Sequence, residues 1–187
     1  SPYSATKIAA DQLAFSYFSS FDVPVTIIRP FNTYGPRQSQ RAVIPTIIAQ
    51  LLTGAETIEL GSTTPTRDFN FVEDTVNGFL AAMLPEKILG QVINLGSGYE
   101  VSVGDTAQLI AKIMQRNVQI TSSQERTRPH ASEVRRLFAA NQRAEELLDW
   151  SPKFAGLDGF ERGLEKTVKW FSNPDNIQRY FAAGYVI

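Results

Sequence analysis

The chain has 187 residues, of which 43% are hydrophobic, and its 18 Lys and Arg against 19 Asp and Glu leave a net charge of -1. This length supports one globular core, and the balanced charge gives no overall attraction to nucleic acid or anionic membranes, so we expect neither partner. Cysteine is absent and His130 is the single histidine, which excludes disulfides, thiolate catalysis and a multi-histidine metal site.

Targeting signals are equally scarce. No stretch approaches the roughly 20 apolar residues needed to cross a bilayer, and no basic and then apolar leader precedes Tyr3. We therefore expect a soluble, cytoplasmic protein without a bound metal.

The first two elements read as a helix followed by a buried strand. Apolar residues at helical intervals predict an amphipathic helix over 4–21, with a wide apolar face. The β-branched run 23–31 is typical of a strand that is buried on both faces of a parallel sheet. A helix that leads directly into such a strand is the second half of a βαβ unit.

Helices and strands continue to alternate after a loop over 32–40. The pattern predicts helices over 42–54, from a cap at Glu73 or Asp74 to about 84, from a cap at Ser102 to 114, and over 141–150 and 157–171. It predicts strands over 57–61, 67–72, 91–95 and 118–121, and no clear periodicity over 126–136. The fold class is mixed α/β.

Tyr3 and Lys7 are the first candidate for chemistry. Residues four apart lie one above the other on a helix, so the Lys7 ammonium can favour the phenolate of Tyr3 and make it an acid or base. This spacing also arises often by chance.

The glycines of the chain do not predict a phosphate site. Gly96 and Gly98 follow a strand and precede a helix, but a dinucleotide fingerprint needs a third glycine where Val101 stands. A plain turn that leads to the Ser102 cap fits better, and no P-loop occurs anywhere.

Polar residues after the strands are candidates for ligand contacts. Asn32 and Arg37 follow the buried strand, at the edge of an α/β sheet where ligands bind, although Asn32 also suits a tight turn with an unusual backbone angle. Arg67 either forms a surface ion pair with its neighbour Asp68 or supplies half of a phosphate clamp. The other half of that clamp would come from a basic segment that is equally explained as a solvated loop: Arg126, Arg128, Arg135 and Arg136.

Glu133 lies within that basic segment. Its carboxylate could accept hydrogen bonds from a ribose diol, or it could simply balance the positive charge around it.

These motifs together resemble the extended short-chain dehydrogenase/reductases, and more narrowly the NAD-dependent nucleotide-sugar epimerases and 4,6-dehydratases. The matching stretches are SPYSATK (1–7), RPFNTYGPRQ (29–38), RDFNFV (67–72), NLGSG (94–98), and RP (128–129) with SEV (132–134). They occur in order from residue 1 to about 154. Within that group the chain looks most similar to bacterial dehydratases of NDP-hexoses or NDP-N-acetylhexosamines.

The resemblance implies a role for each matching position. Tyr3 would take the proton of the sugar 4-hydroxyl while hydride passes to NAD, and Lys7 would hold the nicotinamide ribose. Pro30 and Phe31 would lie against the nicotinamide. The remaining contacts would go to the substrate, with Asn32, Arg67 and Arg128 on the diphosphate and Glu133 on the nucleotide ribose.

The resemblance also implies a domain division. Residues 1–35 would belong to a Rossmann-type NAD-binding domain, and 36–187 mainly to a small mixed α/β substrate-binding region, with about 67–95 returning to the Rossmann sheet. The glycine-rich half of the family is absent from these residues. We therefore expect a C-terminal fragment that is inactive alone and binds NAD weakly or not at all.

The expected substrate is a UDP-, dTDP- or GDP-sugar, and the expected assembly is a homo-oligomer. Dehydration and epimerisation remain open, because the residues that decide between them in the family lie upstream. A non-catalytic nucleotide-sugar binding module, and a structural partner that completes a separate N-terminal half, remain alternatives.

Overall fold

The computed structural model describes residues 1–83, 85–123 and 133–181. The helices are α1 (Pro2–Phe21), α2 (Val43–Leu52), α3 (Val72–Ala81), η1 (Glu86–Ile88), α4 (Val103–Ile113), α5 (Gln142–Leu148), α6 (Gly156–Phe171) and α7 (Pro174–Phe181). The strands are β1 (Ile27–Pro30), β2 (Asn32–Tyr34), β3 (Thr57–Leu60), β4 (Thr66–Phe71), β5 (Val92–Leu95), β6 (Glu100–Ser102), β7 (Gln119–Ser122) and β8 (Arg136–Leu137).

Within the described part of the chain, the strands form three small sheets in which parallel pairing predominates. β1 pairs with β5, β2 with β4, and β3 with β7, all in parallel. β4 also pairs antiparallel with β6 and parallel with β8. The predicted α/β class with parallel strands is therefore confirmed.

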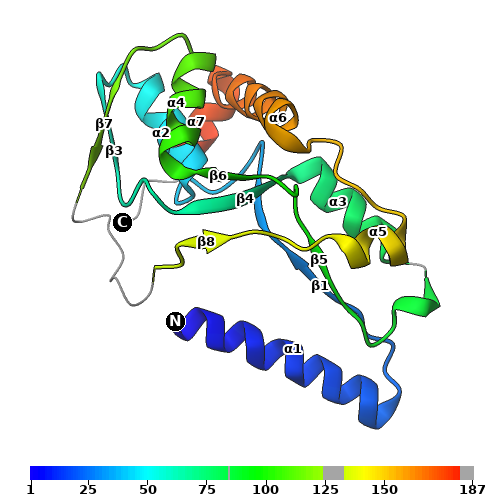
Figure 1. Ribbon diagram of the computed structural model, residues 1–187. Coiled ribbons are helices and arrows are strands. Elements are labelled where there is room, and N and C mark those ends of the chain that lie inside the picture. The colour runs from blue at the N-terminus through cyan, green and yellow to red at the C-terminus, as the bar shows by residue number, and fades with distance from the viewer. Residues whose placement is uncertain (84, 124–132, 182–187) are drawn as a thin grey trace.

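Helix α1 begins where Ser1 caps it, with the Ser1 side chain accepting from the Ser4 N–H. The predicted helix is correct, but its apolar face packs against little: no residue of α1 is buried, and Leu13 remains 61% exposed. Figure 1 shows α1 on one side of the molecule, apart from α2, α4, α6 and α7. Among the described residues, the sheet beside α1 consists of β1 and β5 alone, and it is too narrow to cover a helix of this length.

The strand predicted over 23–31 is shorter and less buried than its sequence indicates. β1 covers only Ile27–Pro30, and its residues are half-buried or exposed because β5 is its one partner among the described residues. The next segment, predicted as a loop, contains β2, whose Asn32 pairs with Phe69 of β4. A further short strand that was not predicted, β6, follows the turn at 96–98 and ends at Ser102. Ser102 caps α4, as predicted.

The start of α3 differs from the predicted cap. The helix begins at Val72 without a side-chain cap, and the Asp74 carboxylate instead accepts from the backbone N–H groups of Lys153 and Phe154, at 3.0 and 2.8 Å. The Trp150 indole N–H donates to the Asp74 carbonyl. A buried carboxylate needs donors, and this one joins α3 to the segment before α6.

The main core lies between β4 and helices α2, α4 and α6. At its centre Tyr34 makes edge contacts with Phe69, Phe71 and Phe160. The Tyr34 hydroxyl donates to the Phe160 carbonyl at 3.2 Å, and burial, then the nearby Asp74 charge, raises the pKa of Tyr34 far above its ordinary value. No helix within the described residues has the length and apolar composition required to cross a membrane.

Candidate functional site

Tyr3 and Lys7 lie together on the exposed first two turns of α1. The Lys7 Nζ lies over the Tyr3 ring, 5.4 Å from its centroid, and Tyr3 is 70% exposed. The structure thus places the ammonium beside the phenol, as the four-residue spacing predicts.

An ion pair orients this part of α1 toward β1. Asp11 lies one turn beyond Lys7 on the same helix face, and its Oδ2 accepts from Arg29 Nη2 and Nε at 2.6 and 2.8 Å. Further along the helix, the space beside Gly90, just before β5, is filled by the Phe18 ring. Because Asp11 is near the end of β1 while Phe18 is near the start of its partner β5, α1 runs antiparallel to both strands.

This direction brings the predicted cofactor residues to one edge. Going toward its N-terminus, α1 passes beyond the carboxyl end of β1 at Lys7 and Tyr3, and β1 continues the same way into Pro30 and Phe31. The Phe31 N–H donates to the Leu95 carbonyl at 2.8 Å, which fixes this strand end against β5. The carboxyl edge of a parallel sheet is where open α/β folds bind ligands.

Asn32 and Arg37 follow that edge. Asn32 is half-buried in β2 and has no left-handed backbone angle, so the tight-turn alternative is wrong. Arg37 instead takes the left-handed conformation, with φ 67°, and is exposed.

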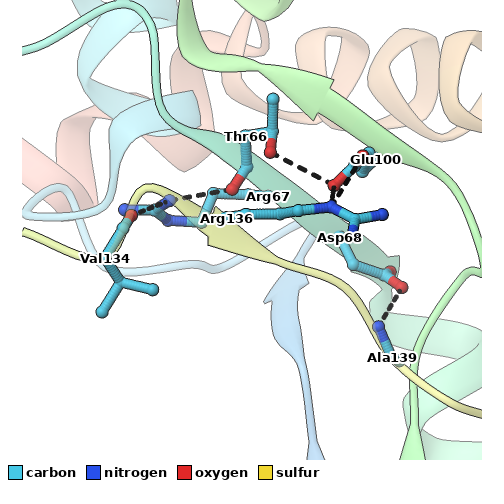
Figure 2. Close-up of polar contacts among 7 residues, drawn as sticks. All are labelled: Thr66, Arg67, Asp68, Glu100, Val134, Arg136 and Ala139. Atoms are coloured by element: carbon cyan, nitrogen blue, oxygen red, sulfur yellow. Dashed lines mark hydrogen bonds and ion pairs between the residues drawn. The ribbon is translucent and has the colours of Figure 1, made fainter.

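The predicted substrate residues Arg67 and Glu133 form one polar pair. Arg67 Nη2 donates to Glu133 Oε1 at 2.8 Å, and both side chains are largely buried, at 15% and 19% exposed. Arg67 Nη1 donates to the carbonyls of Thr66 and Val134, as Figure 2 shows for these last contacts. The ion-pair partner of Arg67 is therefore Glu133 and not its neighbour Asp68.

This pair retains capacity for a ligand. Of the five N–H groups of Arg67, the Nε–H and one Nη2–H have no partner within the described part of the chain. The same holds for Glu133 Oε2. The guanidinium is oriented by one carboxylate oxygen and two carbonyls. Between residues that the structure describes, no hydrogen bond or ion pair joins this pair to Tyr3 and Lys7.

The rest of the predicted clamp divides into three groups, of which the exposed Arg135 is one. Arg126 and Arg128 lie outside the described residues. Arg136 points away from a clamp, because its Nε donates to both Glu100 carboxylate oxygens across β4, at 3.0 and 2.8 Å. The hydrogen bond from Arg136 lowers the pKa of Glu100 below its ordinary value of 4.5.

The turn at 96–98 is not a phosphate cradle, as the missing third glycine predicts. Its N–H groups at Ser97 and Gly98 already donate to the Asp68 carboxylate, at 2.7 and 3.2 Å, and a negative charge there repels a phosphate. Among the described residues, this turn therefore offers no seat for a diphosphate.

Sequence reasoning missed Asp68 and Asp74 as buried hydrogen-bond acceptors. Both are essentially without solvent exposure, at 0% and 1%. The available signal was a pair of carboxylates, one inside a strand and one in the first turn of the next helix, on segments otherwise rich in apolar residues.

Known proteins share extensive similarity with this chain. The family model of GDP-mannose 4,6 dehydratase matches residues 1–167. UDP-glucose 4-epimerase of Mycolicibacterium smegmatis is 34% identical over 176 residues, which are 92% of this chain and 53% of that protein.

Solved structures give the same result. An epimerase from Methanothermobacter thermautotrophicus superposes with a TM-score of 0.84 and 28% identity, over 97% of this chain and 53% of that one. The dTDP-glucose 4,6-dehydratase of Bacillus anthracis, in complex with NAD, superposes with a TM-score of 0.81 and 27% identity, over 94% and 53%. The chain thus spans about half the length of these relatives.

Proposed function

The chain belongs to the NAD-dependent nucleotide-sugar epimerase and dehydratase family, and we propose that it carries the proton-transfer pair and the nucleotide-sugar contacts of such an enzyme. The reaction is oxidation of the sugar C4 hydroxyl, the step from which either a 4-epimerisation or a 4,6-dehydration continues. When bound, NAD supplies the hydride acceptor.

Tyr3 is the proposed base. Its phenolate takes the proton of the 4-hydroxyl as the C4 hydrogen leaves with its electron pair, and the Lys7 ammonium 5.4 Å from the ring centroid stabilises the phenolate charge. The observation that carries this proposal is the antiparallel seating of α1 on β1 through Asp11 and Arg29. It puts Tyr3 and Lys7 at the same sheet edge as Pro30 and Phe31.

Arg67 and Glu133 are the proposed nucleotide contacts. The Arg67 donors that have no partner among the described residues suit a diphosphate oxygen, and the Glu133 oxygen without such a partner suits a ribose hydroxyl. Asn32, at the start of β2, is proposed to add a further donor to the diphosphate.

The 187-residue chain by itself is proposed to bind a nucleotide sugar weakly and to turn none over. Tight NAD binding in Rossmann-type folds depends on a glycine-rich turn at the N-terminus of a helix. The 187 residues contain no such turn. The turn that comes nearest to one, at 96–98, is filled by the Asp68 carboxylate.

A structural role is the second candidate, favoured by exposed apolar surface. Tyr17 and Phe21 of α1 are 50% and 70% exposed, and β1 pairs along one edge only among the described residues. An unpaired parallel edge beside an apolar helix favours association with a further copy or a complementing polypeptide. A catalytically silent nucleotide-sugar binding module is distinguished from both by titration.

Isothermal titration with UDP-glucose, dTDP-glucose and GDP-mannose tests the binding proposal. At least one should bind, and Arg67→Ala should weaken that binding by about tenfold, because a charge-assisted contact to phosphate is lost. Glu73→Gln is the matched control, since it breaks a half-exposed pair with Lys166 away from Arg67. A folded chain that binds none of the three, or a control as weak as Arg67→Ala, contradicts the proposal.

A further inference from the structure

Three consecutive residues of β4 reach the segment that follows Glu133 (Figure 2). Thr66 donates to Glu100, which also binds Arg136. Arg67 binds the Val134 carbonyl at 2.7 Å, and Asp68 accepts from the Ala139 N–H at 3.1 Å. The strand that bears Arg67 thus determines the course of the segment that bears Glu133.

Asp68 is the most buried of the three anchors, with 0% exposure. Its Oδ1 accepts from the Ser97 N–H and hydroxyl, both at 2.7 Å, and its Oδ2 accepts from the N–H groups of Gly98 and Ala139, at 3.2 and 3.1 Å. No ion pair of Asp68 occurs among the described residues. Four donors from two segments converge on one carboxylate, and hydrogen bonds to a charged acceptor are stronger than neutral ones.

The segments that meet there belong to the two halves of the proposed site. Ser97 and Gly98 follow β5, whose Leu95 carbonyl accepts from Phe31, so one arm leads to the cofactor edge. Ala139 follows β8, so the other arm leads back to Glu133. The approach is close, because a Cβ on Gly96 would lie 2.8 Å from Asp68 Oδ2.

A second contact closes the same junction. The Asn141 amide accepts from the Gly96 N–H at 3.0 Å and donates to the Gly96 carbonyl at 2.7 Å. Residues just beyond β5 and just beyond β8 are therefore joined by two sets of hydrogen bonds, one through Asn141 and one through Asp68. Of these two residues, Asp68 is the one that lies in β4.

We propose that Asp68 is a positioning residue for nucleotide binding, which sets the distance between the Arg67 and Glu133 pair and the cofactor edge at Phe31. This inference rests on the proposed function. Asp68 does not touch the substrate. Its carboxylate instead fixes the ends of the strands that carry the substrate-binding groups.

Asp68→Asn tests this role, with Asp74→Asn as a matched control. Both replace a buried carboxylate that accepts backbone N–H groups, but Asp74 joins α3 to the segment before α6 and contacts neither Arg67 nor Glu133. Titration of the 187-residue chain with UDP should show about tenfold weaker binding for Asp68→Asn and a change of less than about twofold for Asp74→Asn. Equal affinities for the two variants overturn the inference while leaving the proposed function intact.

A double-mutant cycle separates positioning from general destabilisation. If Asp68 acts by placing Glu133, then Asp68→Asn costs less affinity when Glu133→Gln is already present, and the two effects are not additive. Hydrogen exchange of residues 133–139 should accelerate more in Asp68→Asn than in Asp74→Asn, when both are compared at equal global stability set by urea. Additive losses, or unchanged exchange, overturn the inference.

Ser97→Ala provides a milder variant if Asp68→Asn does not fold. It removes one of the four donors, the hydroxyl at 2.7 Å, and should weaken UDP binding in the same direction by a smaller factor. Unchanged UDP affinity in a folded Ser97→Ala variant counts against the role of Asp68. Failure of the unmodified chain to bind UDP, dTDP and GDP removes the proposed function and this inference with it; where only dTDP or GDP binds, that nucleotide replaces UDP in each titration.

Discussion

Asp74→Asn should destabilise the fold far more than its position on a short helix indicates. The two Asp74 oxygens accept separately from the backbone N–H groups of Lys153 and Phe154, at 3.0 and 2.8 Å, and the side chain is buried. Asparagine has a single acceptor oxygen, so one backbone N–H would face an amide donor. A lost hydrogen bond to a buried charged group costs about 1.5–3 kcal/mol, and we expect a loss of about 2 kcal/mol.

Urea denaturation measures this loss. With a slope of about 2 kcal/mol per molar urea, the midpoint should fall by about 1 M. Glu73→Gln is the control, because Glu73 is the adjacent residue and its pair with Lys166 is half-exposed, which makes that pair worth about 0.5 kcal/mol or less. If the two variants unfold at the same urea concentration, the argument that Asp74 fastens α3 to the segment before α6 is wrong.

Two further predictions concern packing and charge. Gly163→Ala should lower the Tm by about 5 °C despite the better helix propensity of alanine, because its methyl group would meet the buried Tyr34 hydroxyl; Gly104→Ala, whose nearest neighbour is 3.4 Å away, should not lower it, and equal effects would exclude the clash. Glu100→Gln should remove a pH-dependent contribution to stability. The hydrogen bond from Arg136 lowers the pKa of Glu100 below 4.5, so this contribution is present above pH 4.5 and disappears as the pH falls through the lowered value. Unfolding curves of the wild type and Glu100→Gln should therefore converge on acidification, and a constant difference would contradict the assignment.

Local periodicity predicts α1 to α6 and most of the described strands, but not η1 or α7. The Ser102 cap and the parallel strands follow from turn residues and β-branched runs, and the Tyr3 and Lys7 contact follows from helix geometry. The burial of β1 was predicted wrongly, because burial depends on neighbours that a local pattern does not contain.

Contacts between distant segments were beyond sequence reasoning. Arg67 and Glu133 were both predicted as ligand contacts, but their 2.8 Å ion pair joins residues 66 positions apart. Asp68 and Asp74 look like ordinary acidic residues until the segments that donate to them are in place. β2 and β6 are three residues each, and such short strands exist only because β4 lies beside them. The division of the chain at residue 35 stays a prediction.

The most direct test is an assay of the purified chain with NAD together with UDP-glucose, dTDP-glucose or GDP-mannose. We expect at least one of these sugars to bind by calorimetry, no saturable NAD binding at millimolar concentration, and no change in the sugar detectable by NMR. Tight NAD binding or conversion of the sugar by these 187 residues alone would contradict the proposed function.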